Sequence, residues 1–328
     1  MRILQALLID LLLHGYILGS VAWLLQHWEL LSVPVALVPL SAVMLTAVAW
    51  LAGDSPGRHF LLGAVAGRWY RRWWGICLML ALALTMLVGW LVVRVRPVKF
   101  VMQFANAKHI VISLLSPNWK LLLPLLGKLA ETIYLALLAT VFAIPFAFGL
   151  SFFAARNIMP HNLPGNSVYV AVRTVATIGR SIEAIVWAII FSVWVGIGPF
   201  AGMLALMVHS VAALTKLYSE QIENIDPGPV EAIRATGAGW LQVWFYGVVP
   251  QIFAPYLAFT IYRWDINVRM ATIVGFVGGG GIGLALQQQQ QMLAWRNVGM
   301  IMWLIAFTIW LMDMISGKMR ARLLEIDS

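Results

Sequence analysis

Charged residues are scarce in this chain. Of its 328 residues, 11% are charged and 62% are hydrophobic, and the mean hydropathy is +0.87. A soluble domain carries about 25% charged residues, so a chain of this composition cannot cover a surface that faces water. The scarcity excludes a soluble protein and predicts an integral membrane protein.

Cysteine, nucleotide-binding motifs and metal-ligand spacings are also nearly absent. The single cysteine, Cys77, cannot form an intramolecular disulfide. The pairs Gly127-Lys128 and Gly317-Lys318 are followed by Leu and Met, whereas a P-loop ends in Gly-Lys-Ser or Gly-Lys-Thr. The six histidines show no His-Glu-x-x-His spacing. We therefore predict neither a nucleotide site nor a metal site on this chain.

Long apolar runs are abundant. A helix that crosses a bilayer needs roughly 20 apolar residues, and continuous apolar runs indicate helices rather than alternating strands. We predict eight spans: Ile3–Leu25, Leu31–Leu51, Gly75–Val93, Leu129–Phe152, Val168–Val195, Phe200–Leu217, Tyr246–Tyr262 and Val298–Ser316. We place a boundary near residue 75, with two accessory spans and an interfacial linker in residues 1–74 and a six-span core in residues 75–328.

The net charge of +9 comes from basic residues that flank the predicted spans. This distribution is typical of membrane topology and lipid headgroups, so we expect no nucleic-acid partner. The basic residues show a weak excess on the side that holds the two termini if both are cytoplasmic. We therefore predict a multi-pass protein with both termini in the cytoplasm.

Two segments combine apolar surroundings with unusual polar or glycine content. The segment GGGGIG, residues 278–283, formally matches the dinucleotide pattern G-x-G-x-x-G, but its apolar flanks exclude a soluble βαβ unit. Glycine costs about 1 kcal/mol relative to alanine in a helix, so we expect a helix break and a hinge here. The five glutamines 287–291 are expected to form a polar end to this membrane segment.

The stretch PVEAIRATGAGWLQVWFYGVVP, residues 229–250, begins as a short polar helix between apolar segments. Asp226 suits an N-cap, Pro227 and Pro229 suit a first turn, and Gly237 suits a left-handed C-terminal cap. A helix of about eight residues is marginal in water by itself, so other groups must hold it. Its outward face is expected to present Val230, Ile233, Arg234 and Ala235 to a groove in a partner. From these residues alone, an ordinary interfacial loop helix fits equally well.

The same stretch resembles the EAA-x3-G-x9-I-x-L-P motif of ABC importer permeases. The matching residues are Glu231-Ala232-Ile233, Gly237 and Gly247-Val248-Val249-Pro250, with Ile233, Gly247 and Val249 in place of Ala, Ile and Leu. Further blocks resemble the phosphonate/phosphite branch of these permeases over roughly residues 75–325. They are LAETIYLALLAT and PFAFGLSFFAARN (within 129–157), RSIEAIVWAIIF (180–191), VGIGPFAGMLAL (195–206), IENIDPGPVEAIRATGA (222–238) and YRWDINVRMATIVGFVGGGGIG (262–283).

This resemblance implies an all-α integral membrane protein with the type I ABC importer permease fold, a six-helix core and two extra N-terminal transmembrane helices. It implies a coupling helix near residues 226–240 that seats in a cleft of a separate ATPase, through Glu231, Ala232, Ile233, Arg234 and Gly237. It also implies a bacterial inner-membrane assembly: a second copy of the chain, two cytoplasmic ATP-binding subunits that hold ATP and Mg, and a periplasmic substrate-binding protein. We expect no cofactor on this chain, and we expect that the chain is not itself an enzyme.

The resemblance further implies that the cargo is phosphonate, phosphite or a related phosphorus oxyanion. A permease for another small solute is the first alternative. An ion-coupled secondary transporter is disfavoured because the sequence shows one glycine break and no evident repeat. A membrane enzyme is disfavoured because the thirteen acidic residues are dispersed.

Ionisable residues within or beside the spans are candidates for the translocation path. They are Asp10, His14, Arg180, Glu183, His209, Arg263, Asp265, Arg269 and Asp313. Arg180 and Glu183 are three residues apart and are expected to pair on one helical face, while Arg180 or Arg269 could offer positive potential to an oxyanion. For Asp10 and His14 we expect local hydrogen bonding rather than a proton relay. By resemblance, Gly278, Gly279, Gly280, Gly281 and Gly283 lie near the dimer axis and a gate.

Overall fold

The computed structural model describes residues 2–28, 34, 37–53, 55–62, 73–159 and 162–325. Within these ranges every regular element is a helix, as the sequence predicts. Contacts between residues divide the chain into two compact units, Met1–Phe104 and Ala105–Ser328. We describe each unit separately.

The first unit is built around a long N-terminal helix. Helix α1 (Arg2–His27) contacts α2 (Leu37–Leu51), α3 (Pro56–Leu62) and α4 (Trp73–Val92). The buried Asp10 carboxylate on α1 accepts hydrogen bonds from Trp50 Nε1 and from the Gly57 amide, each at 2.6 Å. The buried His14 Nδ1 lies 3.0 Å from Thr46 Oγ1. Asp10 and His14 therefore join α1 to its neighbours by the local hydrogen bonding expected from the sequence.

The division between the units lies later in the chain than the boundary that we place near residue 75. Helix α4 packs against α1 and α3, so it belongs to the first unit. The division falls within α5 (Pro97–Leu115), a helix in the segment that joins the two units. Sequence hydropathy identifies α4 as a span but carries no information about which helices it contacts. Residues 29–33, 35 and 36, part of the predicted second span and its approach, lie outside the described residues.

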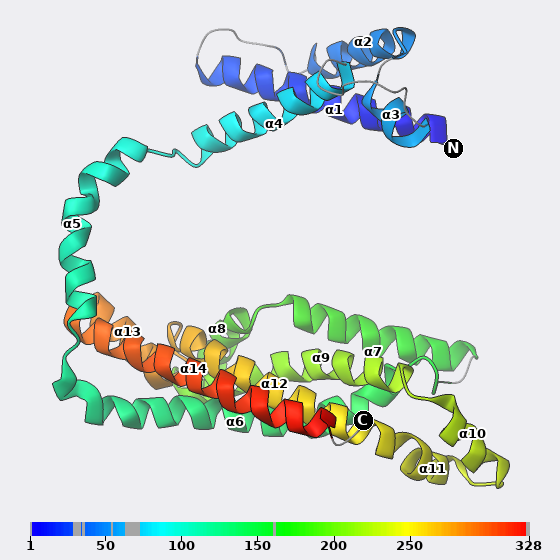
Figure 1. The fold of residues 1–328 in the computed structure, drawn as a ribbon, viewed down its shortest axis with the longest axis vertical. Coiled ribbons are helices and arrows are strands. Elements are labelled where there is room, and N and C mark those ends of the chain that lie inside the picture. The colour runs from blue at the N-terminus through cyan, green and yellow to red at the C-terminus, as the bar shows by residue number, and fades with distance from the viewer. Residues whose placement is uncertain are drawn as a thin grey trace. The chain divides into compact units, whose positions relative to one another are not determined.

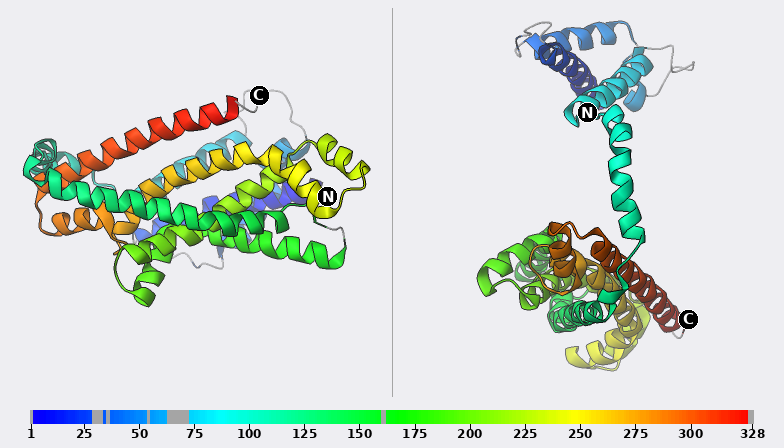
Figure 2. Two further views of the ribbon diagram at one scale, coloured as in Figure 1. Left: turned by 90° about the horizontal axis from the view of Figure 1, so that it is seen from below. Right: turned by 90° about the vertical axis from the view of Figure 1, so that its left-hand side faces the viewer.

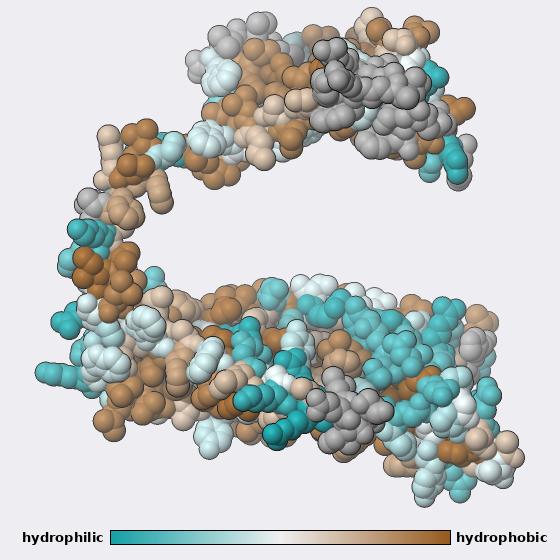
Figure 3. All heavy atoms as spheres, viewed as in Figure 1, coloured by the Kyte–Doolittle hydropathy of each residue, from teal (hydrophilic) through white to brown (hydrophobic). Residues whose placement is uncertain are grey.

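The second unit is a bundle of long helices that lie side by side (Figures 1 and 2). Its elements are the short turn η2 (Trp119–Leu121), α6 (Leu122–Phe153), α7 (Leu163–Ser181), α8 (Ala184–Val195), α9 (Pro199–Glu223), α10 (Pro227–Ala235), α11 (Trp240–Val243), the π-helical turn η3 (Trp244–Val248), α12 (Val249–Gly275), α13 (Gly281–Gln291) and α14 (Trp295–Glu325). Helices α10 and α11 lie at one end of the bundle and α13 at the other. Hydrophilic side chains gather toward the end with α7 and α10 (Figure 3).

Small residues allow α6 and α9 to approach closely. Ala136, Ala139, Ala143 and Ala147 recur every three or four residues on α6 and are fully buried. Ala201 and Ala205 of α9 are equally buried and belong to the same core cluster as Ala136 and Ala139. Small residues at helix interfaces are typical of membrane bundles, because lipid itself offers no hydrophobic driving force for association. Because alanine has a small side chain, the backbones of α6 and α9 can lie close together along this stripe.

Six described helices, or runs of helices, are long and apolar enough to cross a membrane. They are Arg2–His27, Trp73–Val92, Trp119–Phe153, Pro199–Glu223, Leu241–Gly275 and Trp295–Leu323. A seventh candidate consists of α7 and α8 together, but the two helices meet at an angle of 88°. The span predicted over Val168–Val195 is therefore broken into two helices and is not one continuous helix. Ile182 and Glu183 adopt extended backbone angles there, which an unbroken apolar run does not reveal.

Candidate functional site

The short helix α10 has the ends that the sequence predicts. Asp226 has an extended backbone and accepts a hydrogen bond from the Gly228 amide at 2.9 Å. The helix then begins at Pro227 and ends at Ala235, and Gly237 follows with a φ of +80°. Only glycine adopts such a left-handed angle without steric cost. The Asp226 N-cap and the Gly237 cap are both confirmed.

The face that α10 turns outward differs from the predicted face. Val230 and Ile233 are half-buried and point toward Gly247, where an added methyl group would lie 3.3 Å from Val230 Cα and 3.5 Å from Ile233 Cδ1. The prediction that both side chains are fully exposed is therefore wrong, whereas contact of Ile233 with a partner stays a prediction. They are three residues apart on one face and supply the apolar contact that a short helix needs. Glu231, Ala232, Arg234 and Ala235 are exposed, so they form the free face of α10.

One glutamine ties α10 to the start of α12. The Asp226 amide donates to Gln251 Oε1 at 3.0 Å, and Gln251 Nε2 donates to the Asp226 carbonyl at 3.2 Å and to the Gly247 carbonyl at 2.7 Å. These three bonds hold the N-terminus of α10 against η3 and α12. The sequence predicts that a helix this short needs other groups to stabilise it, and these bonds provide that support.

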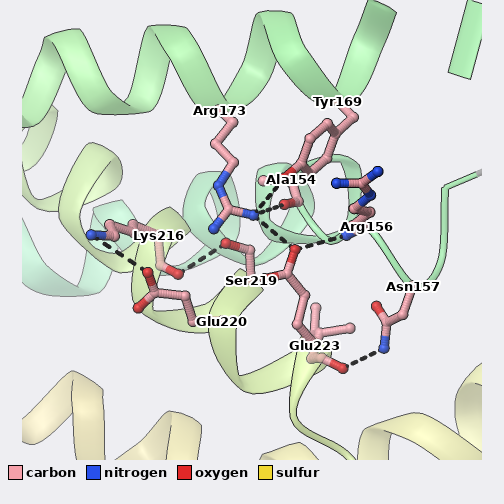
Figure 4. Close-up of polar contacts among 10 residues, drawn as sticks. Ala154, Arg156, Asn157, Tyr169, Arg173, Lys216, Ser219, Glu220 and Glu223 are labelled. Atoms are coloured by element: carbon pink, nitrogen blue, oxygen red, sulfur yellow. Dashed lines mark hydrogen bonds and ion pairs between the residues drawn. The ribbon is translucent and has the colours of Figure 1, made fainter. Parts of the chain in front are cut away.

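An ion-pair cluster fixes the end of α9 that leads into α10 (Figure 4). Glu223 Oε1 accepts hydrogen bonds from Arg173 Nη1 at 2.7 Å and from the Arg156 amide at 2.9 Å. Asn157 Nδ2 donates to the Ile222 carbonyl at 2.7 Å. The last turn of α9 is thus joined to α7 and to the loop that follows α6. Sequence reasoning missed this cluster, because its members are far apart in the chain and follow no spacing rule.

The glycine run forms a close-packed turn between α12 and α13. Gly278, Gly280 and Gly281 have φ values of +97°, +77° and +66°, and the run 278–283 is buried. A side chain on Gly280 would lie 2.8 Å from the backbone nitrogen of Pro199. The predicted helix break is confirmed, whereas the predicted hinge stays a prediction.

Two side chains of α6 cap the N-terminus of α13. Glu131 Oε1 accepts a hydrogen bond from the Gly281 amide at 3.1 Å, and Thr132 Oγ1 accepts one from the Ile282 amide at 2.8 Å. The Glu131 carboxylate also pairs with Lys128 Nζ at 2.8 Å. Because the glycines of this turn have no side chain, α6, α9 and α13 can pack closely together here.

The glycine turn and α10 lie at opposite ends of α9 (Figures 1 and 2). The turn packs against Pro199 and Gly202 at the start of α9, and α10 follows the end of α9 at Glu223. A 25-residue helix is roughly 36 Å long at 1.5 Å per residue. Any signal from α10 to this turn must therefore travel along the whole bundle.

The candidate ionisable residues divide into paired and unpaired groups. Arg269 Nη2 lies 3.0 Å from Asp265 Oδ2 and also pairs with Asp313 of α14. The predicted pair between Arg180 and Glu183 is wrong: among the described residues no ion pair joins them. Helix α7 ends at Ser181 and the chain turns, so the i, i+3 spacing of a helix no longer applies.

The predicted span Tyr246–Tyr262 ends too early, because the polar residues that follow it indicate the end of a membrane segment. Helix α12 continues to Gly275, past the polar residues Arg263, Asp265 and Asn267. These side chains look like the end of a membrane segment in the sequence, but all three are buried within the bundle. In the described ranges, no cluster of three His, Cys, Asp or Glu side chains could hold a metal ion.

Comparison with known families identifies the chain. The family described as binding-protein-dependent transport system inner membrane component matches residues 147–321, which include α7 to α13 and most of α14. The chain belongs to this family. As a member it is a multi-span permease of an ABC importer in the inner membrane, it is not itself an enzyme, and it works with an ATPase and a binding protein.

Relatives with curated names resemble the permease over long stretches. The putative phosphite transport system permease protein HtxC of Stutzerimonas stutzeri is 31% identical over 238 residues, which are 73% of this chain and 83% of HtxC. The putative cryptic phosphonate transport system permease protein PhnE2 of Escherichia coli strain K12 is 45% identical over 118 residues, 36% of this chain and 97% of PhnE2.

A solved structure confirms the fold of the permease. A chain of the inward-facing MetNI methionine ABC transporter superposes with a TM-score of 0.53 and 22% identity, over 63% of this chain and 99% of that chain. At this identity the likeness concerns the fold alone. The fold is that of a type I ABC importer permease, as the sequence predicts.

Proposed function

We propose that the permease carries phosphite, a phosphonate or a related phosphorus oxyanion across the inner membrane, driven by ATP hydrolysis on a separate subunit. The observation that carries this proposal is the similarity to permeases named for phosphite and phosphonate transport. The similarity to HtxC extends over 238 residues, far beyond the short motif around α10, and so supports a shared cargo class as well as a shared fold.

The proposed assembly contains two copies of this chain, two ATPase subunits with bound ATP and Mg, and one periplasmic binding protein. In it, α10 is the coupling helix, and its free face with Glu231, Ala232 and Arg234 seats in a cleft of the ATPase. Ile233 instead holds α10 onto η3 from behind, and Gly237 ends the helix so that the chain can turn back. The bonds to Gln251 and the Glu223 cluster support a rigid transfer of force from α10 into α9 and α12.

The proposed orientation places α10 in the cytoplasm. The C-terminal end of α14 lies toward the same end of the bundle as α10 (Figure 1), which supports a cytoplasmic C-terminus. We propose a cytoplasmic N-terminus as well. The turn with Gly278, Gly279, Gly280, Gly281 and Gly283 then faces the periplasmic side, where it would contribute to a gate. Arg180, Glu183 and Arg269 are proposed to border the path.

Reconstitution tests the proposal. The permease, its ATPase and its binding protein are placed in proteoliposomes, and ATP-dependent accumulation of phosphite, methylphosphonate, phosphate, sulfate and methionine is measured. We expect accumulation of at least one phosphorus oxyanion and none of methionine. Accumulation of methionine or sulfate without any phosphorus compound would contradict the cargo class, and accumulation without ATP would contradict the energy source.

A further inference from the structure

Arg263 is a buried cation without a carboxylate partner. It lies on α12 and is 6% exposed. Its Nε donates a hydrogen bond to Ser210 Oγ of α9 at 3.0 Å, whereas its Nη2 is buried and has no hydrogen-bond partner. Within the described part of the chain, no acidic residue forms an ion pair with it. A buried charge is costly unless it is paired, so this arrangement requires an explanation.

The side chains that share a hydrogen-bond network with Arg263 are neutral. Ser210 Oγ also bonds to Asn267, at 3.1 Å from Oδ1 and 2.8 Å from Nδ2. Asn267 Nδ2 donates in turn to Thr140 Oγ1 of α6 at 2.9 Å. Ser210, Asn267 and Thr140 therefore join α6, α9 and α12 in one buried network. This network fixes the guanidinium in place but supplies no negative charge to balance it.

The network lies near the middle of the bundle. Arg263 is about 18–21 Å from either end of α12, and Ser210 is about 16–20 Å from either end of α9, at 1.5 Å per residue. At this depth a cation is costly, and such residues mark ion and substrate paths. A lipid headgroup belongs at the membrane surface, so it does not reach this position. An anion that enters the protein would supply the missing counter-charge.

The break between α7 and α8 lies close to the same position. His209 precedes Ser210 on α9, and its Nδ1 is 3.1 Å from the Ile182 carbonyl at the break. Non-helical backbone at membrane depth is tolerated only where protein or a water-filled cavity surrounds it, and transporters build midplane sites from broken helices. The break and Arg263 thus independently indicate the same region.

We propose that Arg263 binds the transported oxyanion at the midpoint of the permease, with Ser210 and Asn267 holding its guanidinium in position. This inference rests on the proposed function and adds a binding residue to it. A guanidinium matches the oxygen atoms of a tetrahedral oxyanion with several N–H donors. In this conformation Nη2 is enclosed, so the anion reaches it only when the bundle opens. One cation from each chain, with neutral support, suits a site that must also release its cargo.

The test compares three substitutions of Arg263 with a control at the end of α14. Arg263→Met and Arg263→Gln remove the charge, Arg263→Lys retains it, and Arg322→Gln removes an exposed arginine outside the network. Each full chain is assembled with its ATPase and binding protein, and phosphite and methylphosphonate uptake is measured in proteoliposomes. Co-purification with the ATPase and stimulation of ATP hydrolysis by the loaded binding protein are measured in parallel.

The expected results separate binding from folding. Met and Gln should lower uptake about 10- to 100-fold, the value of a hydrogen bond to a charged group. Assembly and stimulated ATP hydrolysis should stay within about twofold of the unmodified permease, because no ion pair is broken. Lys should show intermediate uptake, and Arg322→Gln should show full uptake.

Two results would overturn the inference. Full uptake of a phosphorus oxyanion by Arg263→Met would show that the charge binds no cargo. Failure of all three Arg263 variants to assemble would show a purely structural residue. Failure of the unmodified permease to carry any phosphorus oxyanion would instead contradict the proposed function.

Discussion

Glu220 and Glu223 lie about one turn apart on α9, and each forms an ion pair, but the two pairs connect different parts of the chain. Glu223 is 25% exposed, pairs with Arg173 and also accepts the Arg156 amide, so it connects α9, α7 and the loop after α6. Glu220 is 40% exposed, and within the part of the chain that the structure describes its ion-pair partner is Lys216 on the same helix, at 3.4 Å. An exposed pair within one helix contributes about 0.3–0.5 kcal/mol. The importance of Glu223 comes from the segments that it connects.

This contrast predicts different effects of two matched substitutions. Glu223→Ala should lower the midpoint of thermal unfolding of the purified permease by several degrees. It should also weaken ATPase stimulation by the loaded binding protein, because α9 would no longer hold α10 in place. Glu220→Ala should change neither quantity measurably. Equal effects of the two substitutions on stimulation would show that the Glu223 cluster does not transmit force.

The residues that the sequence predicts correctly are those with local causes. Asp226 and Gly237 act through backbone groups only a few residues away, so their roles can be derived from spacing and propensity. The inward position of Val230 and Ile233 depends on Gly247, and the isolation of Arg263 depends on α9. Such roles arise from contacts between helices, which hydropathy and spacing do not contain. The predicted Arg180–Glu183 pair is wrong because the apolar run in the sequence gives no sign of the break between α7 and α8.

At the scale of elements, Gly247 determines how closely α10 approaches η3 and α12. The importer motif has isoleucine at this position, but here Val230 and Ile233 occupy the space that such a side chain would fill. The departure from the motif is therefore compensated by the two apolar residues of α10. The helices themselves were predictable from hydropathy, whereas this close approach required the structure.

This packing predicts that Gly247→Ile displaces α10 while the membrane helices remain folded. Stimulated ATP hydrolysis should fall severalfold or more, and co-purification with the ATPase should weaken, because the free face of α10 would be reoriented. Gly239→Ala is the control, since the added methyl would lie in ordinary contact, 3.7 Å from Gln242 Oε1. Unchanged coupling in Gly247→Ile would show that α10 tolerates displacement and that its contact with Gly247 is not required.

At the scale of the whole molecule, the family match lies entirely within the second unit. Residues 147–321 fall inside Ala105–Ser328. The first unit has its own buried polar network around Asp10 and His14, and α4 joins it through Cys77 Sγ, which lies 3.8 Å from His14 Nε2. Hydropathy finds the spans of both units equally well, so the sequence could not show that α4 packs with the first unit.

This division predicts opposite outcomes for two truncated chains. A chain that begins at Arg94 keeps α5 and the second unit whole, so it should be produced in the membrane and co-purify with the ATPase.

A chain that begins at Gly75 keeps α4 without α1 and α3, so the face of α4 that they cover becomes exposed. Cys77, 2% exposed in the full chain, should then react with a membrane-permeant maleimide at least tenfold faster than in the full chain, since burial keeps a thiol inert. Equally slow labelling of Cys77 in both chains would show that α1 and α3 are not what shields this thiol. The boundary near residue 75 would then describe the permease core better than the division at Phe104.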